Sequence, residues 1–245
     1  MTPVLELDNV TKRFGGLRAV KSVSLTMNAG EILFIIGPNG AGKTTVFNLI
    51  SGFLHPNEGT IRFQGQDISR MSPHRAAQLG IGRTFQIVKP LPSLTVLQNV
   101  MLGAFMHTRS PRQAEEASAK ILDFLQMVHL SKFLASGLPL AALKRLEIAR
   151  ALATRPKLIL LDEVVSGLTT SEALALAALV KRLPEWGVSV VGGVEHVMQV
   201  VMKIADRVIV LDYGAKIAEG LPAEVVKKPE VIEAYLGPKF KELTQ

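Results

Sequence analysis

Hydrophobic and polar residues follow strand-like patterns in several segments of the chain. Residues 4–7 and 20–27 alternate in the manner of half-buried strands, with Val20, Val23, Leu25 and Met27 expected on one face. "EILFIIG" at 31–37 is instead a continuous apolar run that ends in Gly. Such a run is typical of a strand that is buried on both faces of a parallel sheet. Two later segments, "KLILLD" at 157–162 and "VSVVGG" at 188–193, are also expected to be buried strands.

Helix signals lie between these strands. Ser72 and Ser110 are each followed by Pro, so each Ser is expected to cap a helix whose first residue is Pro. A further helix is expected at about 171–183, and a hairpin in "DRVIVLDYGAKIAEG", with its turn around 212–215. Strands that alternate with helices predict an α/β fold with a mainly parallel sheet, flanking helices and an antiparallel portion.

Domain organisation follows from the same patterns. The segment from about 88 to 153 has helices and loops without a strand, so we expect a helical lobe there. The parts at about 1–87 and 154–245 are expected to form the main lobe, and 1–245 a single domain. With 245 residues, 48% of them hydrophobic, the chain has enough apolar material for a sizeable core.

Composition narrows the class of protein further. The longest apolar run, at 174–180, is much shorter than the roughly 20 residues that a membrane helix requires. Glu6 and Asp8 stand where a signal peptide would be basic and then apolar, so we expect the chain to stay in the cytoplasm. The absence of cysteine excludes disulfides and thiolate metal sites. The net charge of +7 is scattered along the chain and indicates no partner without a motif.

The strongest chemical signal is "GPNGAGKTT" at 37–45, which fits the phosphate-binding loop G-x-x-x-x-G-K-[ST] between a buried strand and a helix. Glycines let the backbone curl around a phosphate with its N–H groups pointing inward, at the positive end of a helix dipole. Lys43 is expected to reach the β and γ phosphates of ATP, and the Thr44 hydroxyl to ligate Mg²⁺. The expected nucleotide-binding residues of this loop are Gly37, Asn39, Gly40, Ala41, Gly42, Lys43, Thr44 and Thr45.

Two acids end the apolar run in "LILLDEVVSGL" at 158–168. Asp162, at the end of the strand, is expected to hold Mg²⁺ directly or through water, and Glu163 to orient the attacking water as general base. Without the phosphate loop, the simpler interpretation would be a strand with a polar end. His196 follows another expected strand, where ligands of open α/β sheets collect, which favours a role at the γ phosphate.

The order of these motifs resembles the ATP-binding subunits of ABC transporters over nearly the whole chain. "TKRFGGLRAV" at 11–20 looks like the adenine-stacking segment, which implies Phe14 as the aromatic platform and Val20 on the other side of the ring. "RTFQ" at 83–86 resembles the glutamine loop of the family. The resemblance implies that Gln86 touches Mg²⁺ or the attacking water and reports the nucleotide state to the membrane subunit.

Within this family, "GIGRTFQIVKPLPSLTVLQNVMLG" and "PAEVVKKPEVIEAYLG" look most like branched-chain amino acid importer ATPases. The resemblance implies a head-to-tail dimer with a second ATPase subunit, either a related chain or a second copy. It also implies transmembrane permease subunits, indirect action with a solute-binding protein, and a location at the cytoplasmic face of the membrane. No nucleic acid is expected, and the solute stays open.

One motif departs from the family pattern. The family signature begins Leu-Ser-Gly-Gly-Gln and contacts the γ phosphate bound by the other ATPase subunit; this chain has Leu138, Pro139, Leu140, Ala141 and Ala142 in that register. Pro139 removes the hydroxyl and its own N–H, while the helix dipole and the next N–H groups are expected to remain. Gly192 and Gly193 also stand in a strand that is usually apolar, and are expected to soften it.

Two other functions stay open on the sequence alone. A soluble ABC ATPase acting on nucleic acid or ribosomes fits the basic charge, although such proteins usually carry two ATPase domains or a long coiled-coil insertion, and this chain has room for neither. A nucleotide-binding regulatory subunit with little turnover fits the altered signature.

Overall fold

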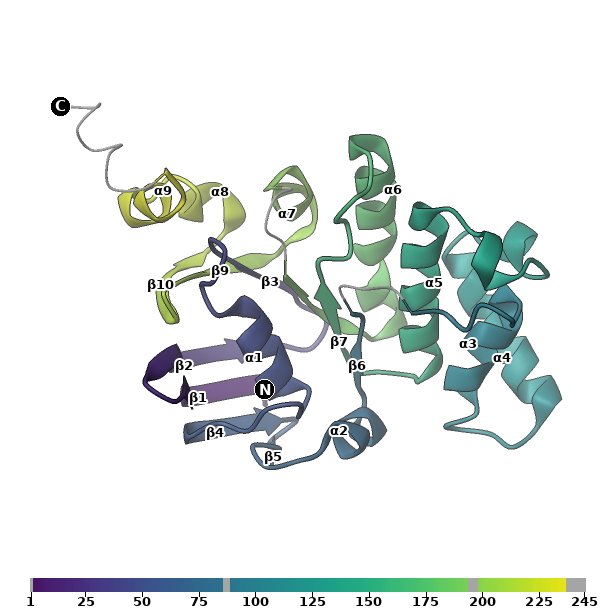
Figure 1. The fold of residues 1–245 in the computed structure, drawn as a ribbon, viewed down its shortest axis with the longest axis horizontal. Coiled ribbons are helices and arrows are strands. Elements are labelled where there is room, and N and C mark those ends of the chain that lie inside the picture. Colours follow the sequence, from purple (N-terminus) through teal and green to yellow (C-terminus); the bar gives the residue numbers. More distant parts are fainter. Residues whose placement is uncertain (1, 86–88, 194–197, 237–245) are drawn as a thin grey trace.

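The computed structural model describes residues 2–85, 89–193 and 198–236, and within them the strands form two sheets (Figure 1). One has the strand order β10-β9-β3-β8-β7-β6, and all of its neighbouring strands are parallel except the antiparallel pair β9–β10. Its strands are β3 (Ile32–Ile36), β6 (Ile81–Arg83), β7 (Leu158–Asp162), β8 (Ser189–Gly193), β9 (Arg207–Asp212) and β10 (Ala215–Gly220). The predicted mainly parallel α/β sheet is confirmed.

The second sheet is antiparallel, with the order β2-β1-β4-β5. It contains β1 (Leu5–Phe14), β2 (Leu17–Met27), β4 (Glu58–Phe63) and β5 (Gln66–Asp67). The four residues expected on one face of β2 are all buried, although Val20 and Val23 are three positions apart. The odd spacing arises because Ser22 has a φ of 49° and the β1–β2 register shifts there, so one extra residue is absorbed.

The helices lie around and between the sheets, and Figure 1 shows α1 between the antiparallel sheet and β3. The part of the chain that the structure describes contains nine α-helices and three 3₁₀ turns. They are α1 (Lys43–Ile50), α2 (Pro73–Leu79), α3 (Val96–Ala104), α4 (Pro111–Phe124), α5 (Leu140–Ala153), α6 (Thr170–Val180), the 3₁₀ turn Leu183–Trp186, α7 (Met198–Ile204), α8 (Pro222–Val225) and α9 (Pro229–Leu236), with two further 3₁₀ turns at Val128–Leu130 and Ala135–Gly137. No helix among the described residues has the length and apolar character needed to cross a membrane.

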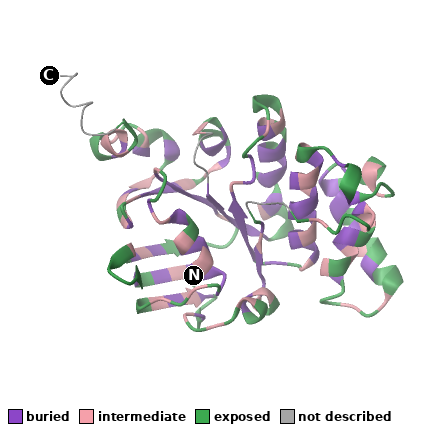
Figure 2. Cartoon of the chain, viewed as in Figure 1, coloured by how far each residue is buried: buried purple, intermediate pink, exposed green. Residues whose placement is uncertain are grey.

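Strand β3 lies between two hydrophobic clusters, which explains its continuous apolar sequence. Leu33 and Ile35 face a cluster shared with α1 and the antiparallel sheet, whereas Ile32, Phe34 and Ile36 face a cluster shared with α3 to α7. The three central strands β3, β8 and β7 are accordingly buried along their whole length (Figure 2). The sequence prediction of a strand covered on both faces is confirmed.

Helices α3, α4 and α5 occupy the region that the sequence assigns to a helical lobe. They pack side by side at the edge of the molecule beyond α6 (Figure 1), and residues 89–157 contribute no strand to either sheet. Thr95 begins α3 with a capping box to Gln98, and the Ser110 hydroxyl accepts a hydrogen bond from the N–H of Gln113 at the start of α4. The division into two lobes near residues 87 and 154 stays a prediction.

The two glycines of β8 have a packing role that the sequence did not indicate. A Cβ on Gly192 would lie 2.5 Å from the Phe34 ring, and one on Gly193 would lie 3.1 Å from the Phe47 ring. Both glycines keep their places in the ladder with β3 and β7. The strand is therefore regular, and its glycines provide the space that two buried aromatic rings occupy.

We expect Gly192→Ala to lower the free energy of unfolding by about 1–3 kcal/mol, because the new methyl group overpacks against the Phe34 ring. Urea denaturation followed by circular dichroism measures the change. Adding Phe34→Leu to this variant should recover part of the loss, since the smaller side chain frees space.

Gly137→Ala is the matched control, because a Cβ there meets no atom within 4 Å. This control should change the unfolding free energy by no more than about 0.5 kcal/mol. Equal effects at positions 137 and 192 would contradict the packing explanation.

Candidate functional site

The loop between β3 and α1 lies at the carboxyl edge of the parallel sheet, where its backbone is tightly confined. Gly37 has a φ of 150°, and a Cβ there would lie 2.0 Å from the carbonyl oxygen of Leu211. Gly42 has a φ of 101°, and its Cβ would lie 2.4 Å from the carbonyl oxygen of Ala19. Neither position has room for a side chain. The spacing of the two glycines therefore follows from the close approach of the loop to β9 and to β2.

Lys43 begins α1 and lies across the loop. Its Nζ donates hydrogen bonds to the carbonyl oxygens of Gly37 at 2.7 Å and Pro38 at 2.9 Å, and the residue is buried. Thr44 and Thr45 follow in the first turn of the helix, where backbone N–H groups carry the positive end of the dipole. The loop thus combines an ammonium group, helix N–H groups and a hydroxyl, which is a donor set suited to phosphate.

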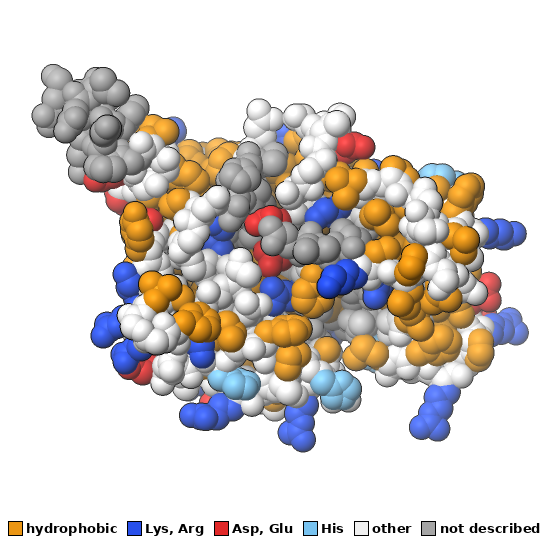
Figure 3. All heavy atoms as spheres, viewed as in Figure 1, with side chains coloured by type: hydrophobic (Ala, Val, Ile, Leu, Met, Phe, Trp, Pro, Cys, Tyr) orange, Lys and Arg blue, Asp and Glu red, His pale blue; other side chains and the backbone are white. Residues whose placement is uncertain are grey.

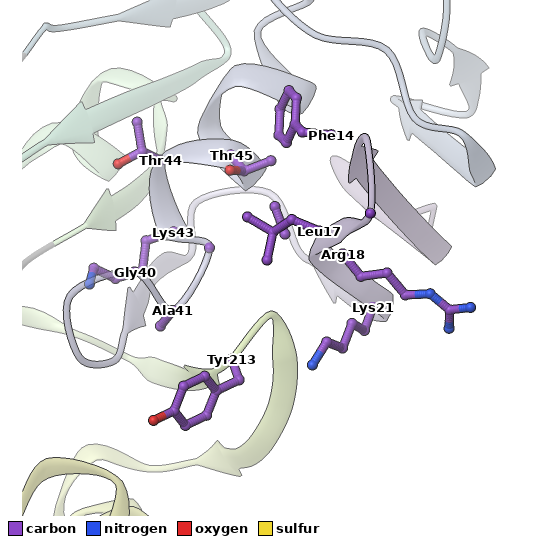
Figure 4. Close-up of a pocket in the computed structure, with 13 residues that line it drawn as sticks. Phe14, Leu17, Arg18, Lys21, Gly40, Ala41, Lys43, Thr44, Thr45 and Tyr213 are labelled. Atoms are coloured by element: carbon purple, nitrogen blue, oxygen red, sulfur yellow. The ribbon is translucent and has the colours of Figure 1, made fainter.

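A cleft of about 630 Å³ opens above this loop (Figure 4). Phe14 and Leu17, from the β1–β2 hairpin, line it together with Tyr213, from the β9–β10 turn. Phe14 is 46% exposed, so a flat ligand can stack on its face. Gly40 to Thr45 form its floor, and the basic side chains of Arg18 and Lys21 stand at its border.

Val20 does not occupy the position that the sequence analysis gave it. The residue is completely buried in the core between the two sheets and does not line the cleft. The bulge in β2 turns Val20 inward, and Leu17 and Ala19 present the apolar surface instead. The expected contact of Val20 with the adenine ring is therefore corrected, because the side chain of Val20 has no exposed surface.

Asp162 ends β7, with only β8 between β7 and β3 in the sheet. Its Oδ2 pairs with Nη2 of Arg83 at 3.1 Å, and both side chains are largely buried. Among the described residues, this ion pair engages Oδ2 of Asp162 and leaves Oδ1 for another ligand.

The described residues contain no group of three or more His, Cys, Asp or Glu side chains that could together hold a metal ion. Magnesium needs no such cage, because it keeps waters and binds through one or two protein groups together with phosphate oxygens. Asp162 and Thr44 fit that donor set.

Glu163 follows in an unusual backbone conformation. Its φ of 49° is rare for a residue other than glycine, and such conformations concentrate at functional sites. Its N–H donates to the carbonyl oxygen of Gly193 at 3.0 Å, and its own carbonyl oxygen accepts from Nζ of Lys144 at 3.3 Å and from the N–H of Ser166 at 3.0 Å. These bonds turn the chain off β7 and hold Glu163 beside the end of β8.

Gln86 and His196 lie outside the described residues, so their predicted roles stay predictions. The residues on both sides of 86–88 are nevertheless fixed by α5. Glu147 Oε1 accepts a hydrogen bond from the N–H of Phe85 at 2.7 Å, and Nη1 of Arg150 donates to the carbonyl oxygen of Lys89 at 2.7 Å. Burial raises the pKa of the Glu147 carboxyl group, and the Phe85 N–H partly offsets this rise.

The altered signature forms the start of α5. Pro139 is the N-cap, its side chain makes no capping bond, and its carbonyl oxygen accepts from the N–H of Leu143 at 3.0 Å. Leu138 and Ala142 are buried, whereas Leu140 is 43% exposed. Because Leu140 to Ala142 form the first turn, their N–H groups have no acceptor within the helix. The expected helix start is confirmed, and its role toward a second subunit stays a prediction.

Several residues of the site carry no recognisable sequence signal. Tyr213 and Gly214 are detectable as a turn, but nothing in the sequence brings that turn to the phosphate loop. Arg83 lies 79 positions from its partner Asp162. Lys144 and Glu147 look like ordinary polar residues of a basic helix, yet both are buried. Only the packing of α5 against the sheet reveals what they contact.

Known proteins are similar to this chain in sequence and in fold. Residues 20–166 match the family model described as "ABC transporter", and 215–237 match "Branched-chain amino acid ATP-binding cassette transporter". The high-affinity branched-chain amino acid transport ATP-binding protein BraF of Pseudomonas aeruginosa is 38% identical, over 96% of this chain and 98% of its own.

Solved structures agree with this result. An ATP-binding cassette of an ABC transporter in its ADP conformation is 34% identical, with a TM-score of 0.88, over 97% of this chain and 100% of its own. A dimeric ATP-binding cassette in a post-hydrolysis state, bound to ADP and phosphate, is 28% identical, with a TM-score of 0.79, over 89% and 98% of the two chains. The chain therefore belongs to the ABC transporter family, as one of its ATP-binding cassettes.

Proposed function

We propose that this chain binds ATP with Mg²⁺ in the cleft between Phe14 and Tyr213, hydrolyses it, and thereby drives the import of a branched-chain or related amino acid. One observation carries the hydrolysis: the phosphate loop and the Asp162–Glu163 pair stand at the carboxyl edge of one parallel sheet, with a single strand between them. Ligands of open α/β sheets bind at this edge.

Each residue has a distinct task in this proposal. Lys43 and the loop N–H groups hold the β and γ phosphates, and Thr44 and Asp162 hold Mg²⁺, with Gln86 as a further contact to the metal or the attacking water. Magnesium neutralises phosphate charge when it is bound. Glu163 accepts a proton from the attacking water, and His196 contacts the γ phosphate.

The proposed solute class rests on the comparisons and not on the cleft. The match at 215–237 carries the words "branched-chain amino acid" in its family description, and the relative BraF carries them in its name. These matches favour the importer over the two alternatives left open by the sequence. On the face drawn in Figure 3, Lys and Arg side chains are also dispersed and do not form one large basic patch for nucleic acid.

A groove suits the proposed contact with a membrane permease subunit at the cytoplasmic face of the membrane. It has a volume of about 490 Å³ and is lined by residues of the sheet, α2, α3 and α5. Phe53, Phe85 and Leu102 line it and are each about half exposed. These exposed aromatic side chains, of which Phe85 directly precedes Gln86 in the sequence, offer an apolar binding surface for a helix of the permease.

The start of α5 supports an asymmetric pairing with a second ATPase subunit. In a head-to-tail dimer, each ATP would lie between the phosphate loop of one chain and the signature of the other. This chain offers a complete loop but no signature hydroxyl, because its N-cap is Pro139. We therefore propose a related chain with a complete signature as the partner, and a solute-binding protein that delivers the amino acid to the permease.

We expect Glu163→Gln to reduce ATP turnover severely while it leaves ATP binding intact, because the amide keeps the shape of the carboxylate and accepts no proton. The rate should fall by about 10² to 10⁴. The measurement is phosphate release, together with uptake of labelled leucine into vesicles that contain the chain, its membrane partners and the binding protein. ATP hydrolysis without uptake of any branched-chain amino acid would remove the proposed solute class. A wild-type rate in the variant would contradict the role of Glu163.

Lys43→Ala provides the contrast, since it removes an ammonium group from the phosphates. Calorimetry should show ATP binding weakened by roughly 10-fold or more, whereas Glu163→Gln should retain the wild-type affinity. Equal affinities in both variants would argue against the contact of Lys43.

A third variant tests the asymmetric pairing. Changing Pro139→Ser, Leu140→Gly and Ala141→Gly together should raise the ATPase rate of the purified chain by about 10 to 150-fold, the value of one charge-assisted hydrogen bond to a phosphate. Thermal melting checks that the variant folds. If the wild-type chain alone already hydrolyses ATP well and the changes add nothing, the present sequence is a working signature and the asymmetric scheme is wrong.

A further inference from the structure

Arg83, at the end of β6, forms hydrogen bonds both to the end of α1 and to the end of β7. Its Nη1 donates to Oδ1 of Asn48 at 2.7 Å and to Oγ of Ser51 at 2.8 Å, both at the end of α1. Its Nη2 pairs with Oδ2 of Asp162 at 3.1 Å. The helix that follows the phosphate loop and the acid at the end of β7 are thus joined through one buried guanidinium group.

The guanidinium group of Arg83 also lies beside the groove, which Arg83 itself helps to line. The Arg83 guanidinium carbon lies 5.5 Å from the centre of the Phe53 ring and 5.2 Å from that of Phe85. The two rings meet edge to face, with centres 5.9 Å apart. Phe53 and Phe85 are 53% and 47% exposed and line the groove, so their outer faces are accessible to a second protein.

These contacts restrict how the guanidinium group can lie. The guanidinium group is planar and the directions of its N–H groups are fixed, so the hydrogen bonds to Asn48, Ser51 and Asp162 determine the orientation of the whole group. The rings of Phe53 and Phe85 lie against this guanidinium group, so a displacement of either ring alters the contacts that hold it. Because Nη2 donates to Oδ2 of Asp162, a reorientation of the guanidinium group would also reorient the carboxylate.

We propose that Arg83 is a positioning residue, which orients Asp162 toward Mg²⁺ and transmits contacts at Phe53 and Phe85 to the metal site. This inference rests on the proposed function, since it requires Asp162 to be the metal ligand. In this proposal Arg83 acts through Asp162 and does not itself contact the nucleotide or the metal. One side chain thus connects the groove with the proposed metal site.

The first test measures metal binding without hydrolysis. Mn²⁺ is titrated into the full chain saturated with ADP, and the free ion is followed by electron paramagnetic resonance. Arg83→Lys should weaken Mn²⁺ binding about 10-fold, because Lys keeps the charge but loses the fork. ADP affinity in EDTA should stay at the wild-type value, since the phosphate loop is unchanged.

Arg207→Lys is the matched control. Arg207 is a partly buried arginine that pairs with Glu31 and Glu219 at the amino edge of the same sheet, away from the phosphate loop. It should lower the melting temperature without changing Mn²⁺ binding. A comparable loss of Mn²⁺ affinity in both arginine variants would overturn the inference, because the effect would then be one of general stability.

The second test uses Phe53, which lies outside "RTFQ" and can be changed without touching Arg83 hydrogen bonds. Phe53→Ala should weaken Mn²⁺ binding by a smaller factor than Arg83→Lys, and adding it to Arg83→Lys should cause little further loss. Full additivity of the two changes, or wild-type binding in both single variants, would overturn the inference and leave the proposed function intact. If the wild-type chain with ADP binds no Mn²⁺ and hydrolyses no ATP, both proposals fall.

Discussion

The burial of α1 between two sheets is the constraint on which the rest of the site depends. Val46, Phe47 and Ile50 lie in the core shared by the parallel and antiparallel sheets, so the helix cannot shift along its axis without opening that core. The loop before it is consequently pressed against β2 and β9, where only glycine fits. The positive end of α1, Lys43 and the cleft wall at Phe14 are all held in place by this packing.

A second constraint comes from α5, which holds the flanks of the site from the opposite side. Lys144, Glu147 and Arg150 are spaced three positions apart, and each bonds to the backbone of a different site segment. They hold the carbonyl of Glu163 and both flanks of residues 86–88. The helix that begins with the altered signature is therefore hydrogen-bonded to Glu163, the proposed general base, and to the residues that flank 86–88.

This chain has the phosphate loop and the acidic pair of the family pattern but an altered signature, and these segments depend on side-chain chemistry to different degrees. The phosphate loop and the acids depend on side-chain chemistry that has few substitutes. The signature depends partly on backbone N–H groups and a helix dipole, which Pro139, Leu140 and Ala141 do not abolish. Leu140 has also gained a local role, since its side chain lies against Gly167, where an added Cβ would be 3.0 Å from it. The changed residues are thus integrated into the packing of this chain.

Local sequence patterns were enough to predict most of the strands and helices, and to propose the phosphate loop and the Asp162–Glu163 pair as parts of one site. Continuous apolar runs specify buried strands, and the Gly and Lys spacing specifies a loop whose function is local to nine residues. The helix caps at Ser110 and the hairpin turn near Gly214 are local for the same reason. Gln86 and His196 were also proposed from the sequence, and the structure does not describe them.

The tertiary structure alone decided which distant residues share the site. It showed that Val20 does not line the cleft, because a bulge in β2 absorbs one residue and leaves Val20 on the buried face with Val23. It brought Tyr213 to the cleft above the phosphate loop. It also packed the Phe34 ring against Gly192, where no side chain would fit. It also joined Arg83 to Asp162, since parallel strands that are far apart in sequence end at the same edge of the sheet. Pairing across the sheet and close packing depend on the whole chain, and no local pattern of residues encodes them.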